Sequence, residues 1–272
     1  PPSLNGSGNM NPSQNLVDAF PMANGYPISD IVNSNYDKNN PYNGRDPRLA
    51  KYIIYNGSIA GVGDVPIYTG RKSGTDDGID VKEQRSTRTG YYMKKRLRMD
   101  VNRALGSVTN QQHYIPRIRY TEMYLAYAEA ANEAWGPKGD NGNGYSAYDV
   151  IKAIRKRAGI LPGDDERYGI PENISKDDFR TLVQNERYIE LAFENKRYWD
   201  LRRWKLAHLK LNNQLTAMEI RKKINGEEIS YTYTRRVQRH DKTNKPVFLE
   251  KFYFLPLPKE ELLRNPNLEQ NE

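Results

Sequence analysis

ERYIELAFENKRYWDLRRW, residues 186–204, is the stretch of this 272-residue chain that decides its fold. Its apolar side chains continue a helical stripe that begins upstream at Ser175, where Ser-Lys-Asp-Asp resembles a capping box with Asp in place of the usual Glu. That stripe consists of Phe179, Leu182, Val183, Ile189 and Phe193. The helical pattern resumes after Asn195 through Tyr198, Trp199, Leu201, Leu206 and Leu209. These spacings predict two consecutive helical segments.

Three carboxylates share one face of the first of these helices. Glu186, Glu190 and Glu194 follow one another at intervals of four residues, and the first two continue the apolar stripe. Because a buried carboxylate is costly without a bidentate partner, we expect a structural network of ion pairs with Arg. The candidate partners are Arg157, Arg187, Arg197, Arg202 and Arg203. The alternative is a glycosidase pair, but two carboxylates on one helix do not face each other across a cleft.

Upstream of this stretch the sequence predicts a helical hairpin. Apolar residues recur at helical spacing from Pro116 until Trp135, where Gly-Pro stops the helix. A Gly-rich loop then leads to a second helix, Tyr145–Ala158, which Gly159 caps. Such a pair resembles one tetratricopeptide unit, of which a stable stack needs about three. Small residues would let a neighbouring helix approach closely, namely Ala126, Ala128, Ala130 and Ala131.

The C-terminal part is predicted to hold strands and coil. Ile229–Val237 alternates in polarity and Val247–Phe254 is rich in β-formers, so residues 240–244 would join them as a hairpin. The tail 256–272 is rich in Pro and Asn, with one helical turn near Glu260–Leu263. The three tryptophans lie within helices or at their ends and are interpreted as core, namely Trp135, Trp199 and Trp204.

Residues 1–116 show no lasting helical period and are rich in Gly, Asn, Pro, Tyr and Asp. They indicate extended loops with short strands, for example Tyr52–Tyr55 before the turn at Asn56-Gly57. Long irregular segments often carry binding loops. The chain has 20 Tyr against 6 Phe and 3 Trp, and Tyr suits half-exposed surfaces that touch polar ligands. The competing interpretation is that these tyrosines fill the margins of a modest core.

The net charge of +8 raises the question of nucleic-acid binding. Both parts of the chain are only mildly basic, because residues 1–115 hold 14 Lys+Arg against 10 Asp+Glu and residues 116–272 hold 28 against 24. One concentrated run, Lys82–Arg103, contains eight basic and two acidic residues. We interpret this run as a solvated face, with phosphate binding as the alternative.

Residue types and spacings argue against most enzyme classes. The chain has no Cys, which excludes disulfides, thiolate metal sites and Cys nucleophiles. Its 3 His are widely separated, and the sequence contains no nucleophile elbow, phosphate-binding loop or dinucleotide fingerprint. The acidic loop Asp76–Asp80 could hold calcium, but it lacks the EF-hand spacing. We therefore predict no catalytic residue, metal or cofactor. No apolar run approaches the roughly 20 residues that span a bilayer.

Several segments, taken in their order along the chain, resemble the C-terminal region of the SusD/RagB family. They are residues 15–22, 24–25, 43–49, 118–130, 154–159, 186–204, 254–258 and 265–271. The resemblance implies a mainly α fold with irregular loops and short β-hairpins, on a tetratricopeptide-like scaffold. It divides the single domain 1–272 into a loop-rich part with ligand-binding loops (1–116), a helical core (117–211), and a hairpin with C-terminal coil (212–272).

The resemblance also implies a function. Members are non-catalytic, outward-facing lipoproteins of the outer membrane that capture oligosaccharides, or peptides in the RagB branch, for a partner TonB-dependent transporter of the SusC type. The lipid anchor would then lie on an N-terminal part upstream of this sequence. No nucleic-acid partner and no cofactor are expected. We expect ligand contacts in the irregular part, with Tyr36, Tyr42, Tyr68 and Tyr91 stacking on sugar faces and Arg71 binding hydroxyls.

Overall fold

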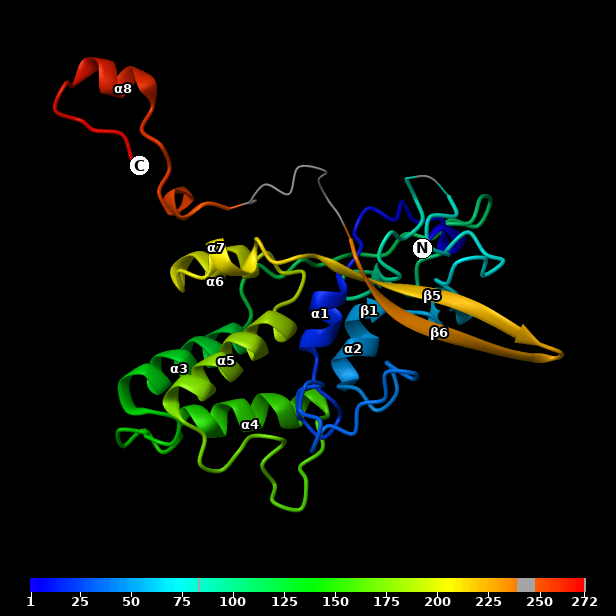
Figure 1. Ribbon diagram of the computed structural model, residues 1–272, viewed down its shortest axis with the longest axis horizontal. Helices are drawn as coiled ribbons and strands as arrows, with labels where there is room; N and C mark the ends of the chain where they lie inside the picture. Colours follow the sequence, from blue (N-terminus) through cyan, green and yellow to red (C-terminus); the bar gives the residue numbers. More distant parts are fainter. Residues whose placement is uncertain (83, 239–247, 272) are drawn as a thin grey trace.

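The computed structural model describes residues 1–82, 84–238 and 248–271, and it divides into a helical half and a loop-rich half (Figure 1). Helices α3, α4 and α5 lie together in the helical half, whereas α1 and α2 lie between them and a long hairpin, β5–β6. The predicted fold class is confirmed, because the chain is mainly helical with short antiparallel strand pairs. No helix among the described residues is long and apolar enough to cross a membrane.

The helical half is built around α3 (Tyr120–Trp135), which packs against both α4 (Ala147–Ala158) and α5 (Lys176–Glu190). The predicted hairpin and third helix are therefore present, although α3 begins four residues after Pro116. After α5 the chain forms two short helices, α6 (Arg197–Arg203) and α7 (Ala207–Lys210). Helix α4 ends at the residue that was predicted to cap it. Gly159 ends α4 with a φ of 89°, a left-handed conformation that favours glycine.

Ser146 begins α4 with a reciprocal cap that predicts a measurable contribution to stability. Its hydroxyl accepts the backbone N–H of Asp149, and the Asp149 carboxylate accepts the N–H of Ser146. We expect Ser146→Ala to lower the free energy of unfolding by about 1 kcal/mol, measured by urea denaturation. Ser230→Ala, in an exposed part of the hairpin, serves as the control. Equal midpoints for the two variants would contradict a role for this cap.

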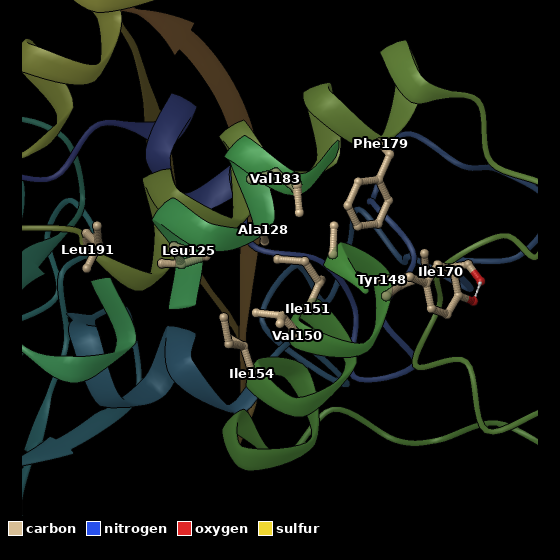
Figure 2. Close-up of a cluster of buried hydrophobic side chains, with 12 residues drawn as sticks. Leu125, Ala128, Tyr148, Val150, Ile151, Ile154, Ile170, Phe179, Val183 and Leu191 are labelled. Atoms are coloured by element: carbon tan, nitrogen blue, oxygen red, sulfur yellow. Dashed lines mark hydrogen bonds between the residues drawn. The ribbon is translucent and has the colours of Figure 1, made fainter. Parts of the chain in front are cut away.

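The core of the helical half lies where α3, α4 and α5 meet (Figure 2). Leu125, Ile151 and Phe179 come from the three helices and are fully buried, each contributing roughly 1.5–3 kcal/mol by removing apolar surface from water. The hydroxyl of Tyr148 reaches the edge of this cluster and donates to the carbonyl of Ile170 at 3.0 Å. The alanines of α3 lie on two faces of the helix, one buried and one exposed. Ala128 and Ala131 are buried in the cluster, whereas Ala126 and Ala130 are exposed.

The loop-rich half contains short elements. After the 3-10 turn Pro2–Leu4 come α1 (Gln14–Ala19) and α2 (Pro47–Tyr52). Strand β1 (Ile53–Ile54) pairs with β4 (Tyr92–Met93), and β2 (Ser58–Ala60) pairs with β3 (Val65–Ile67), all antiparallel. The strand predicted over Tyr52–Tyr55 is shorter than expected because Tyr52 still belongs to α2. A second core cluster joins this half to the end of α5 and to β5 through Leu16, Phe20, Leu49, Ile53, Tyr91, Ile189, Met218 and Ile220.

The long hairpin corrects one prediction. Ile229–Val237 is a strand as predicted, within β6 (Glu228–Val237), but its partner is β5 (Thr216–Asn225). A tight turn at Gly226-Glu227 joins the two strands, so β6 pairs with the segment before it. The predicted partner strand Val247–Phe254 is wrong, because its described residues form a 3-10 helix, Glu250–Tyr253. The predicted turn, residues 240–244, lies outside the described residues.

The end of the described chain packs only in part. Phe248 and Tyr253 pack with Leu201 of α6 and Ala207 of α7, and the Tyr253 hydroxyl accepts the backbone N–H of Ala207 at 2.8 Å. The chain then leads away from the body to α8 (Lys259–Arg264), the helical turn predicted near Glu260–Leu263 (Figure 1).

Candidate ligand-binding surface

The carboxylates of α5 lie in a buried network of ion pairs. Glu186 is 0% exposed and accepts Arg48 Nη1 at 2.6 Å and Arg155 Nε at 3.1 Å. Arg48 also binds Asp46 at 2.7 Å and Glu190 at 2.9 Å, and its own side chain is buried. Because Arg48 belongs to α2, this one guanidinium ties the loop-rich half to α5.

The same network continues past the end of α5, because Glu190 is the last residue of the helix and Glu194, predicted to lie on the same helix, is in the loop that follows. Glu190 Oε1 accepts Arg157 Nη2 at 2.5 Å and Arg119 Nη1 at 2.9 Å. Glu194 accepts Arg119 Nε at 2.8 Å and Lys95 Nζ at 2.5 Å. Each carboxylate therefore has at least two cationic donors.

Burial and neighbouring charges shift the pKa of these carboxylates in opposite directions. Burial by itself raises the pKa of Glu186, but the charges of Arg48 and Arg155 outweigh it, so the pKa lies below its ordinary value. The pKa of Glu190 is lowered in the same way, against its burial, by Arg48 and Arg119. Both carboxylates are thus ionised and saturated with donors. Neither resembles the protonated acid that a glycosidase needs, so the geometry does not support the paired-carboxylate alternative.

The Arg residues predicted to pair with Glu186 and Glu190 have different partners from one another. Arg157 binds Glu190 as proposed, and Arg187 pairs instead with Asp200 at 2.9 Å. Arg197 lies over the ring of Tyr188 at 4.0 Å, and Arg202 donates to the backbone carbonyl of Phe252. Sequence reasoning missed four cationic partners of these carboxylates, namely Arg48 of α2, Lys95, Arg119 just before α3, and Arg155 of α4.

Two of the tyrosines proposed as ligand contacts, Tyr91 and Tyr42, are covered by other side chains, Tyr91 completely and Tyr42 in part. Tyr91 is 0% exposed, and its hydroxyl donates to Gln14 Oε1 at 2.5 Å, so no face of its ring can meet a ligand. Tyr42 stacks on Tyr55 with ring centroids 4.4 Å apart and meets Tyr233 edge-on at 5.4 Å. Both rings are better explained as packing between the loops and the hairpin, which corrects the expectation for Tyr91 and weakens it for Tyr42.

The other proposed contacts remain partly exposed but are not gathered in one place. Tyr36 lines an open cavity of about 510 Å³ and lies beneath the guanidinium of Arg235 at 5.9 Å. Tyr68 stacks on Tyr231 of the hairpin, with ring centroids 6.2 Å apart. Arg71 is paired with Glu219 at 2.6 Å, and neither it nor Tyr68 lines the cavity of Tyr36.

A larger cavity lies between the start of α6 and the segment that precedes α3, and we name it the α5–α6 groove. It measures about 670 Å³ and contains Trp199 of α6, which is 65% exposed, and Tyr114, which is 71% exposed. The prediction that the tryptophans are core is therefore wrong for Trp199, and also for Trp135, which is 41% exposed. Trp204 is half-buried, and its indole N–H donates to Glu129 at 2.7 Å. The groove is lined by residues 95–96, 113–117, 193–196 and Trp199.

The walls of the groove are fixed by polar contacts. Lys196 donates to the carbonyl of Arg117 at 3.0 Å and pairs with Glu122 at 2.9 Å, which ties the α5–α6 loop to the start of α3. Phe193 and Asn195 in that loop have φ values of 64° and 61°. Left-handed backbone is costly for residues other than glycine and gathers at functional sites.

The chemistry of the groove suits a polar ligand with apolar faces. Trp199 and Tyr114 offer ring surfaces, while His113, Asn195 and the neighbouring cations offer hydrogen-bonding groups. Concave sites that combine aromatic walls with a few polar groups are typical of small-molecule and sugar binding.

The carboxylates of the acidic loop 76–80 have separate partners. Asp76 pairs with Lys82 at 2.6 Å, Asp80 pairs with Arg71 at 3.2 Å, and Asp77 accepts the backbone N–H of Ser3 at 2.9 Å. Across the described residues no three His, Cys, Asp or Glu side chains are grouped as metal ligands would be.

Comparison with solved structures identifies the class of fold as that of the SusD-like proteins. The chain superposes on a SusD-like protein from Bacteroides fragilis with a TM-score of 0.67 and 27% identity, over 98% of this chain and 47% of that one. A SusD-like carbohydrate-binding protein from the same species gives a TM-score of 0.62 and 26% identity, over 95% and 48%. The family model described as SusD family matches residues 1–272, so the chain belongs to the SusD family.

A curated relative agrees with this assignment. The SusD-like protein P2 of Formosa agariphila is 34% identical over 160 residues, which is 58% of this chain and 25% of that protein. The chain therefore spans about half the length of the solved relatives and matches a quarter of the curated one.

Proposed function

We propose that this chain belongs to a non-catalytic cell-surface protein that binds oligosaccharides in the α5–α6 groove. The observation that carries the proposal is the pair of highly exposed aromatic rings, Trp199 and Tyr114, on the walls of a 670 Å³ cavity beside Asn195 and His113. Sugars present apolar faces to rings and hydroxyls to polar groups, so this combination fits them. Family membership, and a carbohydrate-binding relative of known structure, support the proposal.

The proposed setting is uptake of nutrients at the outer membrane. The protein would be an outward-facing lipoprotein that holds its ligand for a partner TonB-dependent transporter of the SusC type. Membership of the SusD family supports this setting.

Part of the loop-rich half remains a proposed second contact region. Tyr36, Tyr68 and Arg71 keep partly exposed side chains, and Tyr36 borders a cavity of its own. We propose that they contact parts of a longer glycan, whereas Tyr91 is excluded by its complete burial.

Replacing Trp199 with Ala tests the proposed site. We expect the affinity for an oligosaccharide that binds the unaltered protein to fall about tenfold or more, because the stacking surface is lost. The ligand comes from a glycan array and the affinity from calorimetry. Trp135→Ala is the matched control, since Trp135 is also exposed but lines none of the cavities described above.

Three results would contradict the proposal. One is equal loss of affinity in both Trp variants, and another is release of shortened sugars, which would indicate catalysis. The third is a blank glycan array beside a peptide library that gives saturable binding, which would favour the alternative of peptide capture.

A further inference from the structure

The α5–α6 groove borders a second cavity. This second space measures about 340 Å³ and shares two lining residues with the groove, Arg96 and His113. Its other walls include residues 97–99 and 109–111, and we name it the side pocket. Arg98 ties the two walls together by donating to the carbonyl of Gln112 at 2.8 Å.

The residues that line the groove and the side pocket carry mostly positive charge. Three Lys or Arg line the side pocket and four line the groove, with Arg96 counted in both, so six different cations face one acid, Glu194. Three of these cations have acidic partners, since Lys95 pairs with Glu194, Arg98 with Asp100, and Lys196 with Glu122. Within the described residues the other three form no ion pair, namely Arg96, Arg103 and Arg117.

We propose that the groove and side pocket select acidic glycans, that is, oligosaccharides carrying carboxylate or sulfate groups. This inference rests on the proposed function and names the substrate class of the same site. The planar fork of a guanidinium donates two parallel hydrogen bonds to such groups, which neutral hydroxyls cannot match in strength. Arg117 lies in the same groove as Trp199, so a sugar ring can stack while its acidic substituent is bound.

Nucleic acid is the competing polyanion, because the three cations of the side pocket, Arg96, Arg98 and Arg103, belong to the basic run Lys82–Arg103. Three of the eight cations in that run have acidic partners, since Lys82 pairs with Asp76, Lys95 with Glu194 and Arg98 with Asp100. Strand binding also calls for aromatic side chains that stack on successive bases along a basic track, and the described residues that line the side pocket include no Phe, Tyr or Trp. Membership of the SusD family further favours the glycan.

The experiment compares length-matched probes on the 272-residue chain by calorimetry. The probes are an oligogalacturonate with carboxylates, a sulfated dextran oligosaccharide, the unsulfated dextran oligosaccharide and a single-stranded DNA oligonucleotide. We expect at least one acidic oligosaccharide to bind about tenfold or more tightly than the neutral one, with an affinity that falls as salt rises. The two acidic probes separate carboxylate from sulfate recognition.

Charge-removing variants localise the effect. Arg117→Gln and Arg103→Gln should each weaken binding of the preferred acidic probe roughly tenfold. Arg264→Gln on α8 removes the same charge outside both cavities and should leave the affinity unchanged. Trp199→Ala should weaken binding of the acidic probe as well, because stacking and charge act on the same ligand.

Other results would contradict the inference alone, or the inference and the proposed function together. If neutral and acidic oligosaccharides bind equally, with dependence on Trp199, the selectivity is wrong while the proposed function stands. If DNA binds more tightly than either acidic oligosaccharide, or if Arg264→Gln weakens binding as much as Arg117→Gln, the inference is overturned in favour of nonspecific polyanion attraction. Absence of binding to all oligosaccharides, on a glycan array as well, would contradict the inference and the proposed function together.

Discussion

Arg48→Met is expected to lower the free energy of unfolding by about 3–5 kcal/mol, because it removes a cation that three buried carboxylates share. The Arg48 guanidinium pairs with Asp46, Glu186 and Glu190, and all four side chains are buried. Met fills a similar volume but leaves three carboxylates with fewer donors in a region that water does not reach. Removing one member of a buried ion-pair network is costly because the remaining charges stay desolvated.

Thermal and urea unfolding followed by circular dichroism measure this effect. A loss of this size corresponds to a lower melting temperature by roughly 10 °C for a chain of this length. Arg167→Met is the matched control, since Arg167 pairs with Asp165 and Glu172 at the exposed surface, where ion pairs contribute about 0–1 kcal/mol. Arg48→Lys should give an intermediate loss, because Lys keeps the charge without the planar fork. Similar midpoints for Arg48→Met and Arg167→Met would show that the buried network contributes little.

The second large effect is loss of stability in acid. For Glu186, Glu190 and Glu194, burial alone raises the pKa, yet neighbouring Arg and Lys charges lower it below the ordinary value in each case. A carboxylate with a lowered pKa in the folded protein stabilises that state above the pKa of the unfolded chain, about 4.3. As the pH falls through the lower, folded pKa values, these groups take up protons and the contribution is lost. The contribution of these carboxylates should therefore be complete near neutral pH, and stability should decline steeply below about pH 4.3.

Urea midpoints at a series of pH values and constant ionic strength measure this decline. Glu190→Gln removes one of the titrating groups, so it should be less stable than the unaltered protein at pH 7 and approach it at pH 3. The melting temperature at pH 7 should fall, because Arg119 and Arg157 lose a charged partner. A difference between the two proteins that stays constant with pH would contradict the proposed ionisation of Glu190.

Helices and their ends were predictable from local sequence. The apolar period over residues 120–135, 147–158 and 176–190 and the capping residues Ser175 and Gly159 act within a turn or two of the chain. Such signals need no distant partner, because backbone hydrogen bonds and caps close within four residues. The strand Ile229–Val237 was predictable from its alternation, but its partner was not. Pairing depended on the tight turn at Gly226, which places Thr216–Asn225 beside it.

The candidate site was less predictable. Trp199 and Trp135 have helical spacing that is compatible with a core, and only packing reveals that their rings face solvent. Conversely, Tyr91 lies in an irregular segment that suggested exposure, yet α1 and the hairpin enclose it. A side chain's exposure depends on what packs over it, and that surface comes from residues far away in the sequence.

The sequence by itself determined the family, the order of helices, their caps and the buried character of Glu186 and Glu190. These follow from short-range periodicity and from the rule that a carboxylate on an apolar stripe needs a cation. The tertiary structure decided which cations those are, with Arg48, Arg119 and Arg155 brought from three separate elements. It also decided that Trp199, Tyr114 and Arg96 share one groove, although they are far apart in the chain. Contacts of this kind form only when the whole chain is packed, because no local spacing encodes which distant residues become neighbours.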